Sequence, residues 1–428
     1  MNMLKCNKTL FYIILGFFAL QIIILFSFGY TPYPDSDGYI LLAQHSLKLG
    51  QPYPSISDLK ELKFIWNVGA INAVELSLYI FNSIIPLLII YTIMKVATAF
   101  ILYKIAETLF NKKVAFINLI LYIIYPANYG ESTSTLSEVP FLFFITLGIL
   151  LALKYKNKYE LVILGGCMMA IANWFRPLAI VFLLSMSIYY VIIKYRDYNK
   201  SLYLCIGYLL MIGIIGSISY QRTGHFIYQA RTGWQNLMQY SWDHNENKKV
   251  YSHRNPMYIE NSNNMDCLKR DSIWKERCLN WIIDNPKEYL KQIPSKIFYT
   301  YISDNVNMCA LMKDKNKKYM YGEISMVSLK TNFPYYTSIQ LLTFINLLYY
   351  YTLIIAFIVS CINMIKHKDK KVFMPLLILT LGTMSIALVA HGEARFHNPY
   401  MPFIILAVAH YIYIKFENKI NSVSTFFE

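Results

Sequence analysis

The sequence predicts an all-α polytopic membrane protein with about ten transmembrane helices, and three observations support this prediction. Of the 428 residues, 56% are hydrophobic, and apolar runs of membrane-spanning length recur along the chain. The loops between these runs alternate between lysine-rich and lysine-poor stretches. Most charged residues lie in the loops, which is typical of a chain whose helices are surrounded by lipid.

A span needs about 20 predominantly apolar residues, and ten segments fit this requirement once the shorter ones extend into their flanks. The first segment has a basic flank but no small-residue cleavage site after it, so we interpret it as an uncleaved signal anchor. The predicted spans are Leu10 to Phe28, Ile84 to Leu109, Val114 to Tyr125, Glu138 to Leu153, Leu161 to Ala172, Leu178 to Ile193, Leu202 to Tyr220, Ile339 to Met364, Val372 to Ala390 and Met401 to Ile414.

The net charge of +15 raises the question of nucleic-acid binding, and the positions of the cations answer it. The cations fall in alternate loops, which is the pattern of the positive-inside rule, so we predict a cell-membrane protein with both termini in the cytoplasm. Nucleic acid is therefore not an expected partner. The basic stretches are Lys5 with Lys8, Lys112 with Lys113, Lys154 to Lys158, Lys194 to Lys200, Lys366 to Lys371, and Lys415 with Lys419.

This topology divides the chain into three parts. Residues 1–220 form a transmembrane catalytic module that includes the outer loop 29–83. Residues 221–338 form an extracytoplasmic segment with short helices between the seventh and eighth spans, and residues 339–428 hold the last spans and a cytoplasmic tail.

The extracytoplasmic segment contains two predicted helices. Asp266 to Ile283 is amphipathic, which suits a helix lying on the membrane module, and Asn285 with Pro286 is typical of a cap followed by the first helical position. A disulfide between Cys267 and Cys278 is left open by the sequence.

The preceding stretch, Gly224 to Pro256, is rich in aromatic and amide side chains. These side chains suit either a carbohydrate site or an interfacial aromatic belt, and both interpretations remain open.

Two aspartates follow the first span within the run Y-P-D-S-D-G-Y. Asp35 and Asp37 place a carboxylate pair at one membrane face, where carboxylates are candidates for general-base or metal-binding chemistry. The run from Tyr39 to Gly50 keeps one face at four-residue spacing and ends in glycine, which predicts a short helix with a left-handed stop. Either aspartate at its start has the alternative role of a helix cap.

A second candidate acid opens the fourth span. Thr135 and Glu138 match a capping box, but Thr135 as the cap would place Pro140 too deep in the helix, so Ser137 is the better cap. Glu138 is then available to bind substrate, with stabilisation of the helix dipole as the alternative.

The acidic pair and the spacing from Tyr39 to Gly50 resemble the first outer loop of the GT-C superfamily of glycosyltransferases, and the pattern is most similar to the protein O-mannosyltransferases and the lipid A aminoarabinose transferases. Three further runs resemble loops of these enzymes, so the similarity covers the first half of the chain and one late loop. They are P-A-N-Y-G-E-S-T-S-T-L-S-E-V-P from Pro126 to Pro140, N-W-F-R-P from Asn173 to Pro177, and E-A-R-F-H-N-P-Y-M-P from Glu393 to Pro402.

The resemblance implies that Asp35 takes the place of the catalytic aspartate and that the sugar donor is a polyprenyl phosphate. It also implies that Tyr39 and Glu138 bind substrate. Asp37 stands one residue later than the second acid of many relatives, in a D-x-D arrangement similar to that of metal-dependent oligosaccharyltransferases. A divalent cation, Mg²⁺ or Mn²⁺, held by Asp35 and Asp37 therefore stays open, although two carboxylates alone are too few ligands.

A departing phosphate carries negative charge, so cations are expected at the mouth of such a site. Arg176 and Arg395 are the arginines of the short outer loops, and His391 and Lys296 complete the predicted donor-phosphate set. The alternative for the arginines is snorkelling toward lipid headgroups.

Together these features predict an inverting membrane glycosyltransferase whose active site is extracytoplasmic. A polyprenyl-phosphate sugar is the expected donor, and a glycan, a lipid or a protein is the expected acceptor. Two alternatives remain: an O-antigen-type polymerase or ligase, which uses a pyrophosphate-linked oligosaccharide, and a lipid-linked glycan transporter or flippase.

Overall fold

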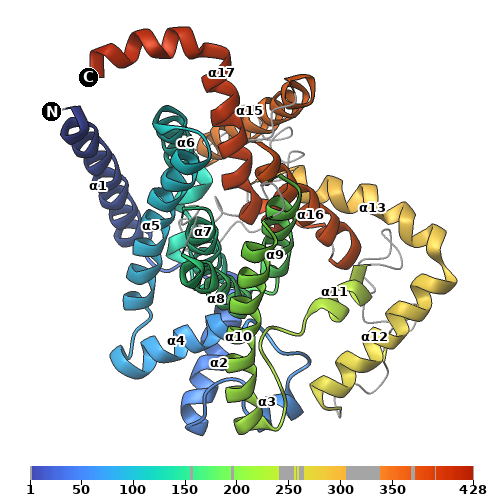
Figure 1. Ribbon diagram of the computed structural model, residues 1–428. Coiled ribbons are helices and arrows are strands. Elements are labelled where there is room, and N and C mark those ends of the chain that lie inside the picture. The colour runs from blue at the N-terminus through green and yellow to red at the C-terminus, as the bar shows by residue number, and fades with distance from the viewer. Residues whose placement is uncertain are drawn as a thin grey trace.

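The computed structural model is almost entirely helical (Figure 1). It describes residues 2–154, 158–193, 197–240, 255–256, 258–259, 265–304, 338–367, 372–390 and 392–427. Within these ranges no β-strand forms, and the one β-bridge joins Ile65 to Arg231. The helices are α1 (Asn2–Phe28), α2 (Pro34–Leu49), α3 (Ile56–Glu61), α4 (Val68–Phe81), α5 (Ile85–Leu109), α6 (Lys112–Ile124), η1 (Pro126–Tyr129), η2 (Glu131–Thr133), α7 (Glu138–Lys154), α8 (Tyr159–Phe175), α9 (Ala179–Ile188), the π-helical η3 (Tyr189–Ile193), α10 (Tyr198–Thr223), α11 (Gly233–Tyr240), α12 (Cys267–Asp284), α13 (Pro286–Tyr301), α15 (Ser338–His367), α16 (Phe373–Val389), η8 (Ala394–Tyr400) and α17 (Met401–Phe427).

The predicted all-α membrane fold is confirmed, and each of the ten predicted spans is helical. Among the described residues, five helices are long and apolar enough to cross a membrane, or six if the bent pair formed by 126–133 and α7 counts as one span. That pair bends by 113°. Ten as the number of spans stays a prediction, because α8, α9 and α16 are apolar but shorter.

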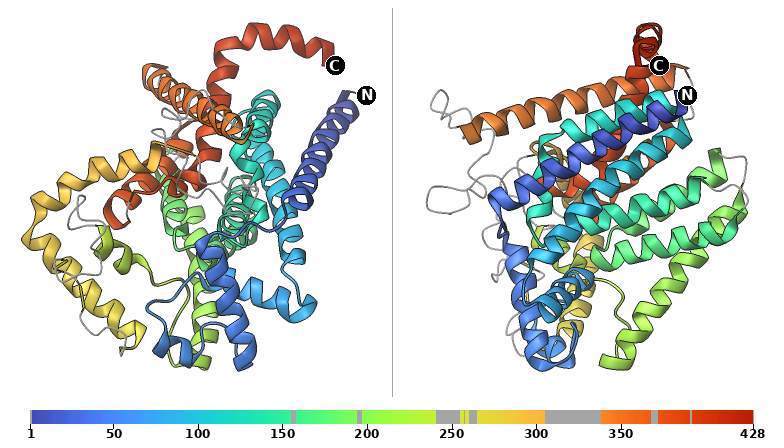
Figure 2. Two further views of the ribbon diagram at one scale, coloured as in Figure 1. Left: turned by 180° about the vertical axis from the view of Figure 1, so that it is seen from behind. Right: turned by 90° about the vertical axis from the view of Figure 1, so that its left-hand side faces the viewer.

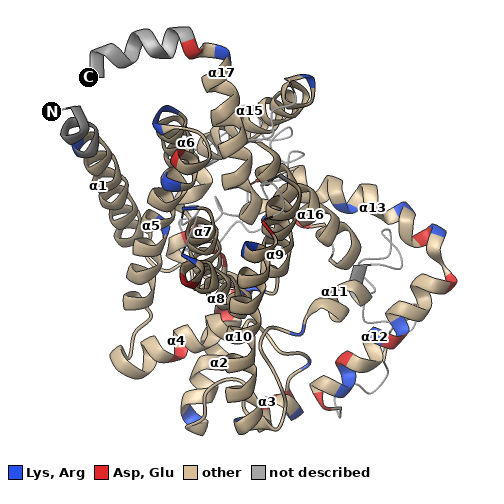
Figure 3. Ribbon diagram, in the orientation of Figure 1, with Lys and Arg blue, Asp and Glu red and all other residues tan. Residues whose placement is uncertain are grey.

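Several of the lysines predicted to be cytoplasmic lie at one end of the helical bundle. The start of α1, the turn between α5 and α6 and the C-terminal end of α15 lie at this end, and α2 and α3 lie at the other (Figure 2). Lys112, Lys113 and Lys366 therefore share one end of the molecule, and blue positions mark the top of α6 in Figure 3. The opposite end also carries lysines, on α2 and α3, so the orientation of the bundle stays a prediction.

The first outer loop folds into α2, α3 and α4. The predicted short helix is confirmed as α2, and Gly50 stops it with a φ of +64° while its N–H bonds to the carbonyl of Leu47. The apolar helix α4, which packs against α2, was not predicted. Its 14 residues are too few for a span, so a search for spans alone misses it.

The start of α7 agrees with the sequence argument. Ser137 directly precedes the helix, and its carbonyl accepts the N–H of Phe141 at 3.1 Å. Pro140 therefore lies in the first turn, where its missing N–H removes no helical hydrogen bond.

The two helices predicted in the outer segment also form. Asp266 caps α12 by accepting the N–H groups of Leu268 and Lys269 at 2.8 and 3.3 Å. Pro286 opens α13, but Asn285 makes no side-chain cap there, and the helix continues through Pro294 to Tyr301.

The disulfide between Cys267 and Cys278 that the sequence left open does not form. Cys267 and Cys278 are both free and buried. They lie on one helix, α12, eleven positions apart, so their Cα atoms are separated by about 16 Å, well beyond the reach of a disulfide.

Close helix packing holds the transmembrane core together, most clearly where α8 meets α10. A Cβ atom at Gly166 would lie 2.1 Å from the carbonyl oxygen of Leu204, and one at Gly207 would lie 1.9 Å from that of Ile163. Small residues let helices approach this closely in a membrane, where packing replaces the hydrophobic effect as the force that joins them.

We therefore expect Gly166→Ala to lower the stability of the protein by about 1–3 kcal/mol, because the added methyl group forces the two backbones apart. Gly213→Ala is the matched control, since Gly213 lies on α10 with no neighbouring atom within 4 Å of its Cβ position. Thermal unfolding in detergent measures both variants. Equal midpoints for the two would show that the α8–α10 contact is not tight.

Candidate active site

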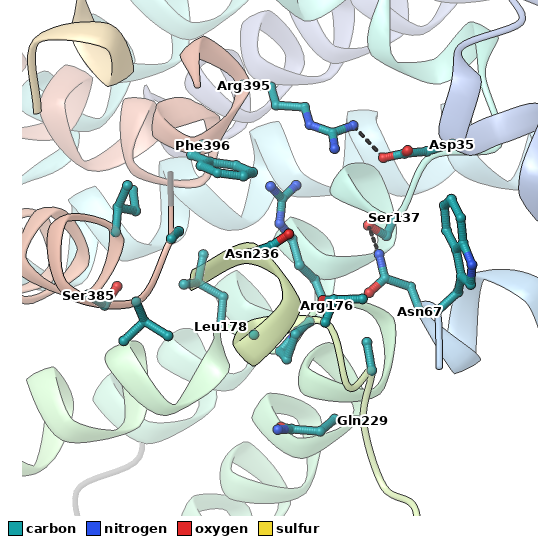
Figure 4. Close-up of a pocket in the computed structure, with 18 of the residues that line it drawn as sticks. Asp35, Asn67, Ser137, Arg176, Leu178, Gln229, Asn236, Ser385, Arg395 and Phe396 are labelled. Carbon is teal, nitrogen blue, oxygen red and sulfur yellow. Dashed lines mark hydrogen bonds and ion pairs between the residues drawn. The ribbon is translucent and has the colours of Figure 1, made fainter. Parts of the chain in front are cut away.

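A cavity of about 600 Å³ brings together residues from widely separated parts of the chain (Figure 4). It lies between the start of α2, the start of α7, the turn from α8 to α9, the segment 229–236, the end of α16 and η8. Five of the predicted site residues line it: Asp35, Tyr39, Glu138, Arg176 and Arg395.

Two arginine–carboxylate ion pairs dominate this cavity. Arg395 Nη1 lies 2.6 Å from Asp35 Oδ2, and Arg176 Nη1 donates to Glu138 Oε1 at 2.5 Å. The ring of Phe396 lies beside both guanidinium groups, whose central carbons are 6.0 Å (Arg395) and 5.6 Å (Arg176) from its centroid. Both arginines of the cavity are therefore ion-paired with a carboxylate.

Local backbone rules place these four charged groups. Pro34 opens α2, so Asp35 stands in the first turn at the positive end of the helix dipole, as Glu138 does in α7. Arg176 ends α8 in an extended conformation, as expected of the residue before Pro177. Arg395 lies in the first turn of η8, and its Nε is also 3.3 Å from Glu393.

Tyr39 lies one helical turn after Asp35 and is fixed by hydrogen bonds. Its hydroxyl accepts from Asn67 Nδ2 at 2.7 Å, and the same amide nitrogen donates to Ser137 Oγ at 3.2 Å. Burial, reinforced by the negative charges of Asp35 and Glu138, raises the pKa of Tyr39. This phenol therefore keeps its proton, and it serves as a hydrogen-bonding wall rather than as a base.

Asp37 does not belong to the cavity, which corrects its predicted catalytic role and the predicted metal pair. Both aspartates lie in α2, and residues two apart on a helix point about 200° from each other. Asp37 is exposed and accepts a hydrogen bond from the Tyr30 hydroxyl at 2.9 Å, while Asp35 faces Arg395.

The carboxylates of Asp35 and Asp37 therefore do not converge on one cation. No group of three acidic, histidine or cysteine side chains with metal-binding geometry occurs within the described ranges either. The described residues therefore do not supply the set of ligands needed for the divalent cation that the D-x-D pattern left open.

The predicted donor-phosphate set is also reduced. Lys296 lies on α13, is fully buried, and does not line the cavity; its Nζ is 5.3 Å from the ring centroid of Tyr289. Burial lowers the pKa of Lys296 to about 8. His391 falls outside the described residues. Arg176 and Arg395 are thus the predicted cations that reach the cavity.

A buried histidine–aspartate pair fixes η8 to the end of α13. His397 Nε2 lies 2.9 Å from Asp304 Oδ1, and its Nδ1 lies 2.7 Å from the carbonyl of Thr300. A carbonyl oxygen only accepts, so Nδ1 donates to Thr300, and the ring is held between this carbonyl and the Asp304 carboxyl group.

The Asp304 carboxylate is itself satisfied by further donors, namely the Tyr125 hydroxyl and Asn346 Nδ2, the latter at 3.1 Å. Four elements that are distant in sequence therefore meet at one carboxylate. This network fixes the end of α13 against η8, two residues from Arg395.

Sequence patterns did not identify the aromatic and amide part of the cavity wall. Phe64, Trp66 and Asn67 come from the segment between α3 and α4. Gln229 and Asn236 come from the segment 229–236. The one available signal was the aromatic and amide content of the stretch that begins at Gly224, which left a carbohydrate site open.

Residues 71–220 match the family model described as dolichyl-phosphate-mannose-protein mannosyltransferase. The matched region begins in α4 and ends in α10, so it includes Glu138 and Arg176 but not Asp35 or Arg395. The predicted resemblance to the GT-C superfamily is confirmed over these residues. No curated protein matches the chain significantly.

Two solved structures from Archaeoglobus fulgidus are similar to this chain. The archaeal oligosaccharyltransferase AglB, in complex with an inhibitory peptide and a dolichol-phosphate, has 11% identity and a TM-score of 0.49; the match covers 96% of this chain and 51% of that one. An oligosaccharyltransferase tethered to an acceptor peptide has 11% identity and a TM-score of 0.41, with 90% and 50% covered. The chain thus spans about half the length of each.

The buried Lys296 makes stability depend on pH in a defined window. Its pKa falls from 10.5 to about 8 on folding, so between these values the unfolded chain binds more protons and stability rises with pH. Below pH 8 both states are protonated, and the full cost of burying the charge remains.

We therefore expect Lys296→Met to remove a rise of up to about 3 kcal/mol across this window, at about 1.4 kcal/mol per pH unit. Lys291→Met is the control, because Lys291 lies on the same helix with its side chain 70% exposed. Thermal midpoints between pH 7 and 10.5 measure the effect. Parallel pH profiles for wild type and Lys296→Met would contradict the assignment.

Proposed function

We propose that this chain, whose residues 71–220 match a mannosyltransferase family of the GT-C superfamily, is a membrane glycosyltransferase that moves a sugar from a polyprenyl-phosphate donor to an acceptor at the extracytoplasmic face. One observation carries the proposal: the cavity lining combines an apolar wall, two arginines, and acidic and amide side chains. This combination matches the lipid, phosphate, sugar and acceptor parts of such a reaction.

The apolar part of the wall comes from α9 and α16. Leu178, Ile180, Ile386 and Val389 line this side of the cavity, and α9 and α16 pack against each other. In Figure 4, Leu178 and Ser385 lie on one side, the two arginines and Phe396 lie in the middle, and Asp35 and Asn67 lie on the other side. A polyprenyl chain suits the apolar side, since its hydrocarbon loses no hydrogen bonds there.

The arginines suit the donor phosphate. Arg176 and Arg395 each direct Nη1 to a carboxylate, and a guanidinium group has five N–H donors, so each retains further donors for phosphate oxygens. Both guanidinium groups lie beside Phe396 in the same cavity, so one phosphate can meet two cations. Such contacts stabilise the negative charge that grows on the leaving phosphate.

Asp35 is the general base of the proposed reaction. It takes the proton of the acceptor hydroxyl while that oxygen attacks the anomeric carbon of the donor sugar. The glycosidic bond forms as the bond from the anomeric carbon to the phosphate oxygen breaks, so the configuration inverts, and the polyprenyl phosphate leaves with both electrons. Arg395 contacts Asp35 directly, which keeps the base beside the phosphate.

The Asp35→Asn variant tests the proposed general base. Asparagine keeps the size of the side chain but cannot take the proton, so the transfer rate should fall by about 10² to 10⁴-fold. Asp37→Asn is the matched control in the same helical turn and should keep near wild-type turnover, because Asp37 lies outside the cavity.

Sugar transfer by the purified variants, with a panel of polyprenyl-phosphate sugars and mass spectrometry of the released carrier, tests this pair. Thermal unfolding confirms that both variants fold. Near wild-type turnover by Asp35→Asn would remove Asp35 from the mechanism. Release of carrier only from pyrophosphate-linked oligosaccharides would favour the polymerase or ligase alternative instead.

The two arginines are expected to hold the donor. Arg176→Ala and Arg395→Ala should each weaken binding of polyprenyl-phosphate sugar by about 1.5–3 kcal/mol, the value of a charge-assisted hydrogen bond. Arg277→Ala serves as the control, since Arg277 lies on α12 and does not line the cavity. Equilibrium binding in detergent measures the affinity. Unchanged affinity in both cavity variants would assign the arginines to a structural role.

The outer location of the site is tested by cysteine labelling. Lys48→Cys and Lys291→Cys should react with a membrane-impermeant thiol reagent added outside intact cells, whereas Lys112→Cys should react only after permeabilisation. All three positions are exposed, and the unmodified protein gives the background. The opposite pattern would place the cavity at the cytoplasmic face.

A further inference from the structure

An extended segment builds one wall of the cavity from residues that lie between two helices. Arg231 N–H bonds to the carbonyl of Ile65 at 2.9 Å, and this antiparallel bridge holds the segment 64–67 beside 229–232. Successive side chains of an extended chain point to opposite sides. Ile65 is therefore turned into the core, with 1% of its surface exposed, while Phe64 and Trp66 line the cavity.

These two rings form an aromatic platform beside the proposed base. Their centroids are 5.2 Å apart at an interplanar angle of 33°, and the Trp66 ring meets the edge of Tyr39 at 5.7 Å. Tyr39 is one turn from Asp35, so the platform and the carboxylate share one side of the cavity. Neither Phe64 nor Trp66 is fully buried, which leaves part of each ring to meet a ligand.

Amide side chains line the same cavity as the platform. Asn67 follows Trp66 directly, and Gln229 lies on the facing segment, where its Oε1 accepts from Asn173 Nδ2 at 2.6 Å. This bond fixes the orientation of the Gln229 amide, so that Nε2 supplies donors. Asn236, on α11, adds a third amide.

Charge distinguishes this wall from the rest of the cavity. The charged residues that line the cavity are those of the two ion pairs and Glu393, whereas 64–67 and 229–230 contribute uncharged lining residues. A phosphorylated or otherwise anionic acceptor would need unpaired cations here. A peptide strand would need a backbone edge to pair with, and Ile65 and Arg231 already use theirs for each other at this point.

We infer, on the basis of the proposed function, that the acceptor is an uncharged saccharide, whose ring packs on Phe64 and Trp66 while its hydroxyls bond to Asn67 and Gln229. Aromatic faces suit the C–H face of a sugar ring, and amides offer both donors and acceptors to its hydroxyl groups. One hydroxyl of this sugar gives its proton to Asp35 and forms the new glycosidic bond. The enzyme then extends or decorates a glycan rather than a protein or an anionic lipid headgroup.

Binding tests this inference without any turnover. Purified full-length protein is titrated with octyl glucoside analogues that carry one or two neutral sugars, in a sugar-free detergent, and in parallel with serine- and threonine-containing peptides. We expect the glycosides to bind and the peptides not to bind. Trp66→Ala should weaken glycoside binding by roughly tenfold, and Trp66→Phe should restore most of it.

Transfer provides the second measurement. With a polyprenyl-phosphate sugar that the protein consumes, Trp66→Ala should raise the KM for the glycoside acceptor and leave the KM for the donor unchanged. Gln229→Leu should have the same signature, and it supplies the measurement if Trp66→Ala does not fold.

The outcomes separate the two proposals. If the protein consumes no donor sugar with any acceptor, the proposed glycosyl transfer is overturned. In that case, glycoside binding that depends on Trp66 would still support the saccharide site. Transfer to peptides with no binding of glycosides, or a Trp66→Ala effect confined to the donor KM, would overturn the saccharide acceptor and leave the transferase intact.

Discussion

The two ion pairs Asp35–Arg395 and Glu138–Arg176 are the interaction on which the site depends. They join the start of α2 to η8 and the start of α7 to the end of α8, so elements from both ends of the chain meet in one cavity. Burying a charged side chain, even partly, lowers the stability of the fold unless the charge is paired and hydrogen-bonded. The Glu138 side chain is only 9% exposed, so loss of Arg176 would leave a buried charge without compensation.

The ion pairs have a chemical consequence as well as a structural one. A cavity lined by bare arginines would bind any anion, whereas arginines that already contact carboxylates bind only an anion that uses their remaining N–H groups. Arg395 contacts Asp35 and Glu393 together, so the proposed base and the proposed phosphate site are linked through one side chain. A shift of Arg395 at the proposed phosphate site therefore also moves the ion-pair partner of the proposed base, Asp35.

Support for this arrangement comes from outside the membrane module. η8 carries Arg395 and Phe396, and it is fixed by His397, which is fully buried against Asp304 and Thr300 at the end of α13. Gly392 also packs against the backbone of Lys296, where a Cβ atom would lie 2.3 Å from its carbonyl oxygen. Helix α13 is thus part of the scaffold that positions the cavity arginine.

The sequence by itself determined the helices and several of the charged groups of the site. Apolar runs predict membrane helices because lipid requires each backbone to satisfy its own hydrogen bonds, and the α2 stop at Gly50 and the α7 start at Ser137 follow from local backbone rules. Asp35, Glu138, Arg176 and Arg395 were identified from short motifs next to helix ends, and all four line one cavity.

Only the tertiary structure decided which of these groups meet. Asp37 was assigned to the site, but it faces away because both aspartates lie in α2, where side chains two residues apart point about 200° from each other. Lys296 was assigned as a phosphate ligand, yet it is buried on α13, outside the cavity lining. Trp66 lines the cavity next to Ile65, whose backbone pairs with that of Arg231 far along the chain, and no local pattern encodes such a contact because it depends on how distant segments pack.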